Sequence, residues 1–207
     1  MNLMVKTIYS TQAANSHILI CGETKDAAIF DVGYVSDEIL EVLKGLSLKY
    51  IFLTHRHYDH ILGAYDLREK TGAKIVIGEL DSNALKDPND SLAAHAPHMK
   101  FTPTFADILV KDGDEVSFGE EKIKVISTPG HTVGGVCYSA QNFLFTGDTL
   151  FNFSIGRTDL PSGNMGEMRK TLSKIKSLEK NYEVFCGHGD NTTLDFEKKH
   201  NPYFNEA

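Results

Sequence analysis

This sequence lacks the features of an exported or membrane-spanning chain. Its first residues contain no basic segment followed by an apolar run, so no signal peptide is expected. No apolar stretch approaches the length of about 20 residues that a membrane-spanning helix needs. We therefore expect a cytoplasmic protein that does not associate with a membrane.

The chain also has few cysteines and no excess of basic residues. Its three cysteines, Cys21, Cys137 and Cys186, are scattered through apolar segments, which favours buried reduced thiols over disulfide bonds. The formal net charge is -7, and Lys and Arg are mixed among the acidic residues, so the chain offers no basic face to phosphates. A nucleic-acid substrate is therefore not expected.

What remains is the composition of a folded domain. The 207 residues are 41% hydrophobic and 24% charged, which is enough for one domain with a sizeable core. No internal repeat, low-complexity segment or linker interrupts the sequence. We therefore expect a single domain that spans residues 1–207.

Short apolar runs and amphipathic segments follow one another along the chain. Strands are predicted at 3–8, 17–21, 27–32, 50–53, 74–77, 107–110, 115–118, 122–127, 136–139, 142–146 and 183–186. Helices are predicted at 36–43, 60–70, 79–85, 164–178 and 192–199. Ser36 should cap the first helix and Gly72 should end the second. In this α/β pattern each half of the chain consists of strands followed by a helix, which predicts two sheets faced by helices.

A long irregular stretch within residues 79–104 interrupts this pattern. Loops of this length in compact domains are often lids or binding loops. The stretch contains His95 and His98, which either line the mouth of a pocket or belong to a solvated loop.

The segment His55-Arg56-His57-Tyr58-Asp59-His60 is the most informative part of the sequence. Imidazole and carboxylate together suit zinc, and equally iron or manganese. In an extended segment that leaves a strand, His55 and His57 point to the same side and can bind one ion. Asp59 and His60 follow as the chain turns, and they must aim at a second, adjacent point. A His-rich surface loop is the competing interpretation, and partner ligands elsewhere would decide between the two.

Three later residues, His131, Asp148 and His188, share one context. Each follows an apolar strand and lies beside a glycine. Polar residues at strand ends next to glycine are where an α/β sheet builds its active site, because glycine allows a close approach. Each residue alone is more often structural. Together with the His cluster, they predict a complete metal centre.

The order and context of these residues resemble the metallo-β-lactamase superfamily over essentially the whole chain. The detail is similar to the branch of glyoxalase II, a hydroxyacylglutathione hydrolase. The agreeing segments are 54–55, 128–132, 146–151, 154–161, 187–189 and 201–203. The resemblance implies an αββα sandwich of two mixed β-sheets flanked by helices. It also implies two divalent metal ions at the sheet edge, zinc foremost, with iron or manganese as alternatives.

The resemblance further assigns ligands to both metals. They are His55, His57 and His131 for the first ion, Asp59, His60 and His188 for the second, and Asp148 as the bridge. Asp31 would support the site from behind by accepting a hydrogen bond from a metal-bound imidazole, and a simple turn residue is the alternative. Arg157 either frames the site for a substrate carboxylate or only orders its own turn through an ion pair.

The expected activity is the hydrolysis of a small-molecule thioester. Two adjacent cations lower the pKa of a bound water to about 7, and Asp59 would orient the resulting metal-bound hydroxide for attack on the carbonyl carbon. A thiolate leaving group needs little protonation, because thiol pKa values are about 8.5. The chain departs from full glyoxalase II in one respect, because that enzyme carries a C-terminal helical domain with much of its glutathione-binding surface. Here the sequence ends soon after His188, so a different thiol carrier comes into consideration.

Other activities of the same fold remain open at this point. A persulfide dioxygenase uses a single iron held by two His and one Asp, and further members hydrolyse lactones or other esters. All seven ligand positions are filled here, which favours the hydrolase without being decisive. A metal-sensing or scaffold protein is the non-catalytic alternative, and it would have no reason to keep both metal sites.

Overall fold

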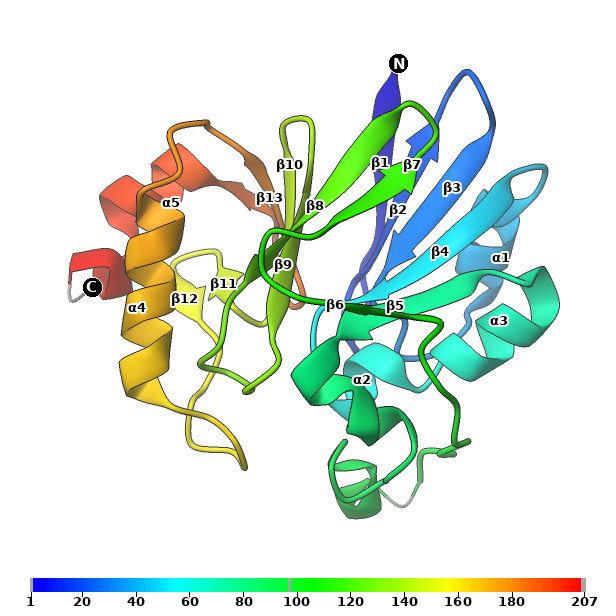
Figure 1. Cartoon of the computed structure of the whole chain (residues 1–207), viewed down its shortest axis with the longest axis horizontal. Helices are drawn as coiled ribbons and strands as arrows, with labels where there is room; N and C mark the ends of the chain where they lie inside the picture. Colours follow the sequence, from blue (N-terminus) through cyan, green and yellow to red (C-terminus); the bar gives the residue numbers. More distant parts are fainter. Residues whose placement is uncertain (1, 97, 206–207) are drawn as a thin grey trace.

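The computed structural model of the protein describes residues 2–96 and 98–205, in which two six-stranded mixed sheets pack face to face (Figure 1). The first sheet has the order β1 (Leu3–Ile8), β2 (Ser16–Cys21), β3 (Asp26–Phe30), β4 (Ser47–Leu53), β5 (Lys74–Gly78) and β6 (Ile108–Val110). Strands β3 to β6 run parallel to one another, so their carboxyl ends meet at one edge.

The second sheet has the order β14 (Thr192–Thr193), β13 (Glu183–Cys186), β10 (Phe143–Gly147), β9 (Val136–Ala140), β8 (Glu121–Ser127) and β7 (Glu115–Phe118). Only β10 and β13 run parallel among the described strands of this sheet. A separate two-stranded sheet, β11 (Leu150–Phe151) with β12 (Ser154–Ile155), was not predicted.

Helices cover the two outer faces, as the αββα prediction requires. On one side of Figure 1 lie α1 (Asp37–Leu43), the short α2 (Tyr58–Ile61) and α3 (Ala64–Thr71). On the other side lie α4 (Met165–Lys176) and α5 (Leu194–His200). The 3₁₀ turns are η1 (Glu79–Leu85), η2 (Ala93–His95) and η3 (Pro202–Asn205). Within the part of the chain that is described, no helix is long and apolar enough to cross a membrane.

Alternating side chains on the strands divide the core into three layers. In β4, Phe52 packs between the sheets, whereas Ile51 packs under the helices of the first sheet. Phe30 from the first sheet stacks on Phe145 from the second, with ring centroids 3.6 Å apart. Aromatic packing therefore joins the sheets directly above the edge where the strands end.

The prediction of one helix over residues 60–70 is wrong, because the chain breaks at Gly63. The backbone N–H of Gly63 donates to the carbonyl of Val32 at 2.8 Å, and a Cβ at Gly63 would lie 2.8 Å from a Val32 methyl carbon. This close approach interrupts the helix, so part of the His cluster lies in the separate short helix α2.

The two predicted caps are confirmed. The hydroxyl of Ser36 accepts a hydrogen bond from the backbone N–H of Ile39 at 3.2 Å and so starts α1. Gly72 ends α3 in the left-handed conformation, with φ of 72°. These local signals set the lengths of the helices that cover the first sheet.

Candidate metal centre

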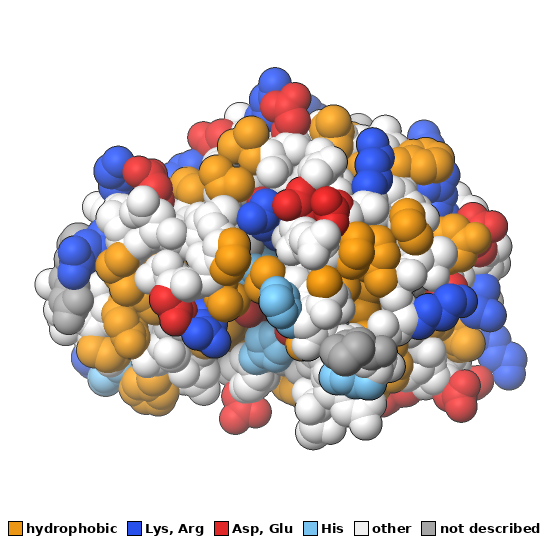
Figure 2. Space-filling model, turned by 90° about the horizontal axis from the view of Figure 1, so that it is seen from below, with side chains coloured by type: hydrophobic (Ala, Val, Ile, Leu, Met, Phe, Trp, Pro, Cys, Tyr) orange, Lys and Arg blue, Asp and Glu red, His pale blue; other side chains and the backbone are white. Residues whose placement is uncertain are grey.

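All seven residues predicted to bind metal lie at one edge of the molecule, where several strands end. His55 follows β4, and His57, Asp59 and His60 lie at the start of α2 or within it. The other three follow β8, β10 and β13 of the second sheet. Seen from this edge, His side chains lie in a hollow between the two halves of the molecule (Figure 2). Both sheets therefore contribute to the centre.

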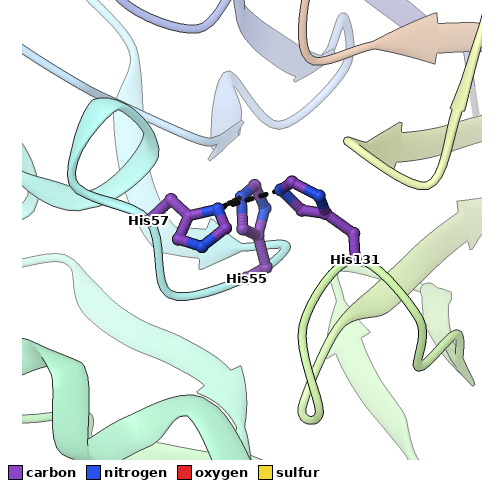
Figure 3. A group of neighbouring side chains, drawn as sticks. All are labelled: His55, His57 and His131. Atoms are coloured by element: carbon purple, nitrogen blue, oxygen red, sulfur yellow. Dashed lines mark hydrogen bonds between the residues drawn. The ribbon is translucent and has the colours of Figure 1, made fainter. Parts of the chain in front are cut away.

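The first group consists of His55, His57 and His131, which are all buried. The Nε2 atom of His55 lies 3.1 Å from Nδ1 of His57, which in turn lies 2.9 Å from Nε2 of His131. Figure 3 shows His55 and His57 reaching from one segment toward His131 on another. Three imidazole nitrogens thus converge, and such a donor set suits zinc and other borderline divalent metals.

The second group consists of Asp59, His60 and His188. Oδ2 of Asp59 lies 3.1 Å from Nε2 of His188 and 3.7 Å from Nε2 of His60. Asp148 lies between the groups. Its Oδ2 is 3.5 Å from Nε2 of His131, and its Oδ1 is 3.2 Å from Nε2 of His60. One carboxylate therefore faces both sets of donors.

Hydrogen bonds behind the centre orient its imidazoles. Nδ1 of His60 donates to Oδ2 of the buried Asp31 at 2.8 Å, so Nε2 faces the centre. Thr54 holds the same carboxylate through its backbone N–H and its hydroxyl, each at 2.8 Å. Nδ1 of His131 donates to the backbone carbonyl of Arg157 at 2.7 Å. These contacts fix which nitrogen of His60 and of His131 is available to a metal.

The imidazoles of the centre differ in ionisation: against the effect of burial, the neighbouring carboxylates raise the pKa of His60, and the hydrogen bond with Asp59 raises the pKa of His188. Burial lowers the pKa of His55 well below its usual value, and burial with the nearby His131 lowers the pKa of His57 to about 3. Neutral imidazoles keep the lone pair that a metal ion needs. Burial alone would raise the pKa of Asp59, but the neighbouring imidazoles, His60 first, bring that pKa below its usual range. Asp59 is therefore a carboxylate.

Polar atoms without partners indicate that the residues fit metal ions. Within the described residues, Nε2 of His60 and Oδ1 of Asp148 are buried and have no hydrogen-bond partner. Such atoms are unfavourable in a folded protein unless a ligand satisfies them. Oδ1 of Asp148 also lies 3.6 Å from Nε2 of His188. Divalent cations would satisfy these donors, so the side chains fit two ions.

Two glycines let the strand ends come this close. Gly147 has φ of 49°, and a Cβ there would lie 2.1 Å from the hydroxyl oxygen of Thr54. A Cβ at Gly187 would lie 2.4 Å from Oδ1 of Asp148. A larger residue at Gly147 would collide with Thr54 after β4, and one at Gly187 would displace the predicted ligands Asp148 and His60. This explains the glycines that accompany the predicted ligands in the sequence.

A cavity of about 470 Å³ opens onto the centre. Besides the predicted ligands, its lining residues are Tyr58, Leu92, Phe151, Gly156, Arg157 and Leu160. Among these described lining residues Arg157 is the only Lys or Arg, and most of the others are apolar. A concave site with a mainly apolar wall and a few polar groups at its base is typical of small-molecule binding.

Arg157 makes the ion pair that was considered for it and also lies beside the cavity. Its exposed guanidinium makes two hydrogen bonds of 2.7 Å to Asp159, which orders its own turn, and it also lines the cavity. His95 and His98 are exposed and do not belong to the described lining of this cavity. Their positions agree with the solvated-loop alternative.

Sequence reasoning missed residues that support the centre from a distance. The backbone N–H of Asn15 donates to the carbonyl of Gly187 at 2.7 Å and so holds the turn that carries His188. The buried Asp81 accepts hydrogen bonds from the Thr132 hydroxyl at 2.6 Å and from a backbone N–H two residues later, beside a predicted ligand. Neither residue belongs to a local pattern, so no signal in the sequence could have found them.

Comparison with known proteins defines the class. Residues 12–188 match the sequence model of the metallo-beta-lactamase superfamily. This match covers most of the chain, so the protein belongs to the metallo-β-lactamase superfamily of metal-dependent hydrolases. The family and the αββα fold predicted from the sequence are confirmed.

Three relatives illustrate the range of similar proteins. An uncharacterised protein of Aquifex aeolicus is 32% identical over 198 residues, which cover 94% of this chain and 93% of that protein. The probable metallo-hydrolase YqgX of Bacillus subtilis is 32% identical over 197 residues, covering 93% and 92%. The hydroxyacylglutathione hydrolase of Brucella ovis is 39% identical over 147 residues, which cover 70% of this chain and 49% of that enzyme. The chain thus matches about half the length of that enzyme.

Solved structures agree with this placement. The BLEG-1 B3 metallo-beta-lactamase has a TM-score of 0.89 at 32% identity, covering 97% of this chain and 99% of that one. TTHA1623 in a di-iron-bound form has a TM-score of 0.82 at 28% identity, with the same coverage. ETHE1 from Myxococcus xanthus has a TM-score of 0.77 at 27% identity, covering 96% and 83%. The di-iron form shows that zinc is not the sole metal found in proteins of similar structure.

Proposed function

We propose that this protein is a binuclear metal-dependent hydrolase that cleaves a small thioester. The observation that carries the proposal is the position of Asp148 between two groups of donors. Its two carboxylate oxygens lie 3.5 Å from Nε2 of His131 and 3.2 Å from Nε2 of His60. The seven predicted ligands surround these contacts, and this supports the assignment made from the sequence. We propose zinc as the metal, with iron or manganese as alternatives, because His-rich sites suit all three.

Two bound cations would make a nucleophile from water at neutral pH and polarise the substrate carbonyl. The chain's own residues orient these partners. The side chain of Asp59 is 22% exposed and lines the cavity, so one of its oxygens can accept a hydrogen bond from the attacking water. His188, 40% exposed, lies 3.1 Å from the same carboxylate at the open side of the centre. Water and substrate therefore meet the centre beside Asp59 and His188.

The cavity favours a substrate whose leaving group needs little help. Apart from the predicted ligands, Tyr58 and Arg157, its described lining residues carry no ionisable side chain that could protonate a poor leaving group. A thiolate leaves without such assistance, because thiol pKa values are about 8.5. The similarity to a hydroxyacylglutathione hydrolase supports the same type of bond.

The alternatives differ in metal content and chemistry. A mononuclear iron persulfide dioxygenase would use one metal site, and a lactone or other ester hydrolase would use the same two. The second group of donors, Asp59, His60 and His188, favours the binuclear hydrolase over the dioxygenase.

The decisive experiment measures turnover of S-acyl thiols, lactones and persulfides on protein of known metal content. We expect two divalent ions per chain and fastest turnover of a thioester, followed by release of free thiol. Oxygen consumption on a persulfide by protein with one iron per chain would contradict the proposal. Hydrolysis of lactones but not of thioesters would agree with the proposed binuclear centre and would contradict the proposed substrate.

A further inference from the structure

One residue of the cavity wall has an unusual backbone conformation. Leu92 has φ of 63° and ψ of 8°, in the left-handed region that a bulky side chain adopts only with strain. Such a backbone persists where the surrounding contacts impose it, and it is frequent at binding sites. Leu92 is half-buried and lines the cavity over the proposed metal centre.

Neighbouring contacts hold Leu92 in this conformation. The hydroxyl of the fully buried Ser91 donates to the carbonyl of Asp87 at 3.3 Å. The carbonyl of Ser91 accepts a hydrogen bond from the backbone N–H of Tyr58 at 2.9 Å, and this ties the loop to the first residue of α2. The backbone N–H of Leu92 donates to the carbonyl of Asn89 at 3.1 Å. The loop therefore presents the Leu92 side chain at a fixed place beside the predicted ligands.

Away from the predicted ligands, the described wall of the cavity is mainly apolar. The other large apolar lining residues are Tyr58, Phe151 and Leu160. Among the described lining residues, the guanidinium of Arg157 is the only Lys or Arg group, and it already binds both carboxylate oxygens of Asp159. A thiol with two carboxylates, such as glutathione, would find little charge to pair with here. An apolar group would gain by leaving water.

Resting on the proposed thioester hydrolysis, we infer that Leu92 is a specificity-determining residue that selects an apolar group next to the scissile bond. An apolar chain packed on this side chain is removed from water, and each fully buried CH₂ strengthens binding about fourfold. The strained backbone keeps the side chain in place before the substrate arrives, so no ordering of the loop opposes binding. Leu92 thus sets the choice of substrate and takes no part in the chemistry.

The test compares hexanoyl and acetyl thioesters of N-acetylcysteamine, a small uncharged thiol, on the metal-loaded protein. The unmodified protein should prefer the hexanoyl thioester in kcat/KM. Leu92→Gly removes the side chain and suits the left-handed backbone, so the hexanoyl-to-acetyl ratio should fall about tenfold in a folded protein. Leu92→Asn, which also tolerates this backbone, should lose the preference in the same way.

Lys25→Gly is the matched control. Lys25 is exposed in the turn between β2 and β3 and has nearly the same φ, 62°, away from the lining of the cavity. Its replacement changes the same kind of backbone, so the substrate ratio should stay that of the unmodified protein. An unchanged ratio in Leu92→Gly, or an equal fall in Lys25→Gly, would overturn the inference.

Binding of thioether analogues separates this inference from the proposed function. Calorimetry with S-hexyl and S-ethyl N-acetylcysteamine, which cannot be hydrolysed, measures the preference without turnover. A hexyl preference that Leu92→Gly loses supports the role of Leu92 even in a protein that hydrolyses no thioester, and then the proposed function alone fails. Equal affinity of the unmodified protein for both thioethers would refute the role of Leu92.

Discussion

The two groups of predicted ligands differ in how they meet solvent. In the first group, His55, His57 and His131 are at most 5% exposed. In the second group, the side chains of Asp59 and His188 are 22% and 40% exposed. Residues of both groups line the cavity, and His60 of the second group is fully buried, so the difference lies in Asp59 and His188, which are more exposed than any residue of the first group. One centre thus combines a sheltered site with an accessible one.

This difference suggests a division of labour between the two ions. A buried set of three imidazoles, held from behind by hydrogen bonds, should release a metal slowly because several groups must move together. The accessible site can exchange water and substrate without disturbing the fold. We therefore expect the first ion to be retained longer and the second to face the substrate, and each prediction below tests this expectation.

The largest effect should come from Asp148→Ala, which removes the carboxylate between the groups. Without it, the two sites repel each other's cations and lose a shared ligand, so metal analysis should find fewer than two ions per chain. The value of kcat/KM should fall by about a thousandfold, comparable to the loss of a group that stabilises the transition state directly. Asp112→Ala, at an exposed carboxylate paired with Lys174, should keep both ions. Two tightly bound ions in Asp148→Ala would contradict the proposal that Asp148 binds both metal ions.

A paired substitution separates the two sites. His188→Ala should lose one ion and keep the other, because the buried first group is untouched. His57→Ala should lose the sheltered ion and also lower the thermal unfolding temperature, because it leaves a gap among buried side chains. Activity should fall about a hundredfold or more in both, since each lacks one of two cations. Identical metal content and identical stability of the two variants would contradict the proposed difference between the two metal sites.

The first half of this centre could be predicted because its geometry is local. His55 lies in a bend after β4 and His57 is extended at the start of α2, and the nitrogens of their rings lie close together, as the two-residue spacing predicted. Asp59 and His60 point toward His188, the third member of the second group, because the chain enters helix α2 at Tyr58. Short-range spacing and the strand that precedes it contain this information.

The other half depends on contacts between distant segments. His131, Asp148 and His188 could be recognised by their glycine neighbours, but their distances follow from the packing of one sheet on the other. Asn15 lies near the start of the chain and holds the turn before His188 near its end, and no periodicity links them. The strained backbone of Leu92 likewise depends on its surroundings, since leucine has no preference for that conformation. Residues of this kind become visible only in the folded chain.

Asp31→Asn should weaken the second site more than the first. Asp31 accepts the hydrogen bond from Nδ1 of His60, and an amide in its place can no longer hold that ring as firmly. Loss of such a partner lowers metal affinity about 10- to 100-fold. Competition with a chelator should show this fall for one ion only. Asp26→Asn, at the start of the strand β3 that Asp31 follows and paired with exposed Lys49, should have no effect. An equal loss in both variants would contradict the assignment of Asp31 to His60.

The smallest effect should come from a substitution of Thr54, whose hydroxyl contacts one residue associated with each group of ligands. It donates to Oδ2 of Asp31 at 2.8 Å and lies 3.1 Å from Nδ1 of His55. Thr54→Val removes this contact, but Asp31 keeps its bond to His60. The loss should therefore be that of one hydrogen bond, about 1 kcal/mol or roughly fivefold in metal affinity, for both ions together. Thr54→Ser keeps the hydroxyl and should restore both affinities. A loss confined to one ion would mean that Thr54 serves a single site, and the two groups would then be supported independently.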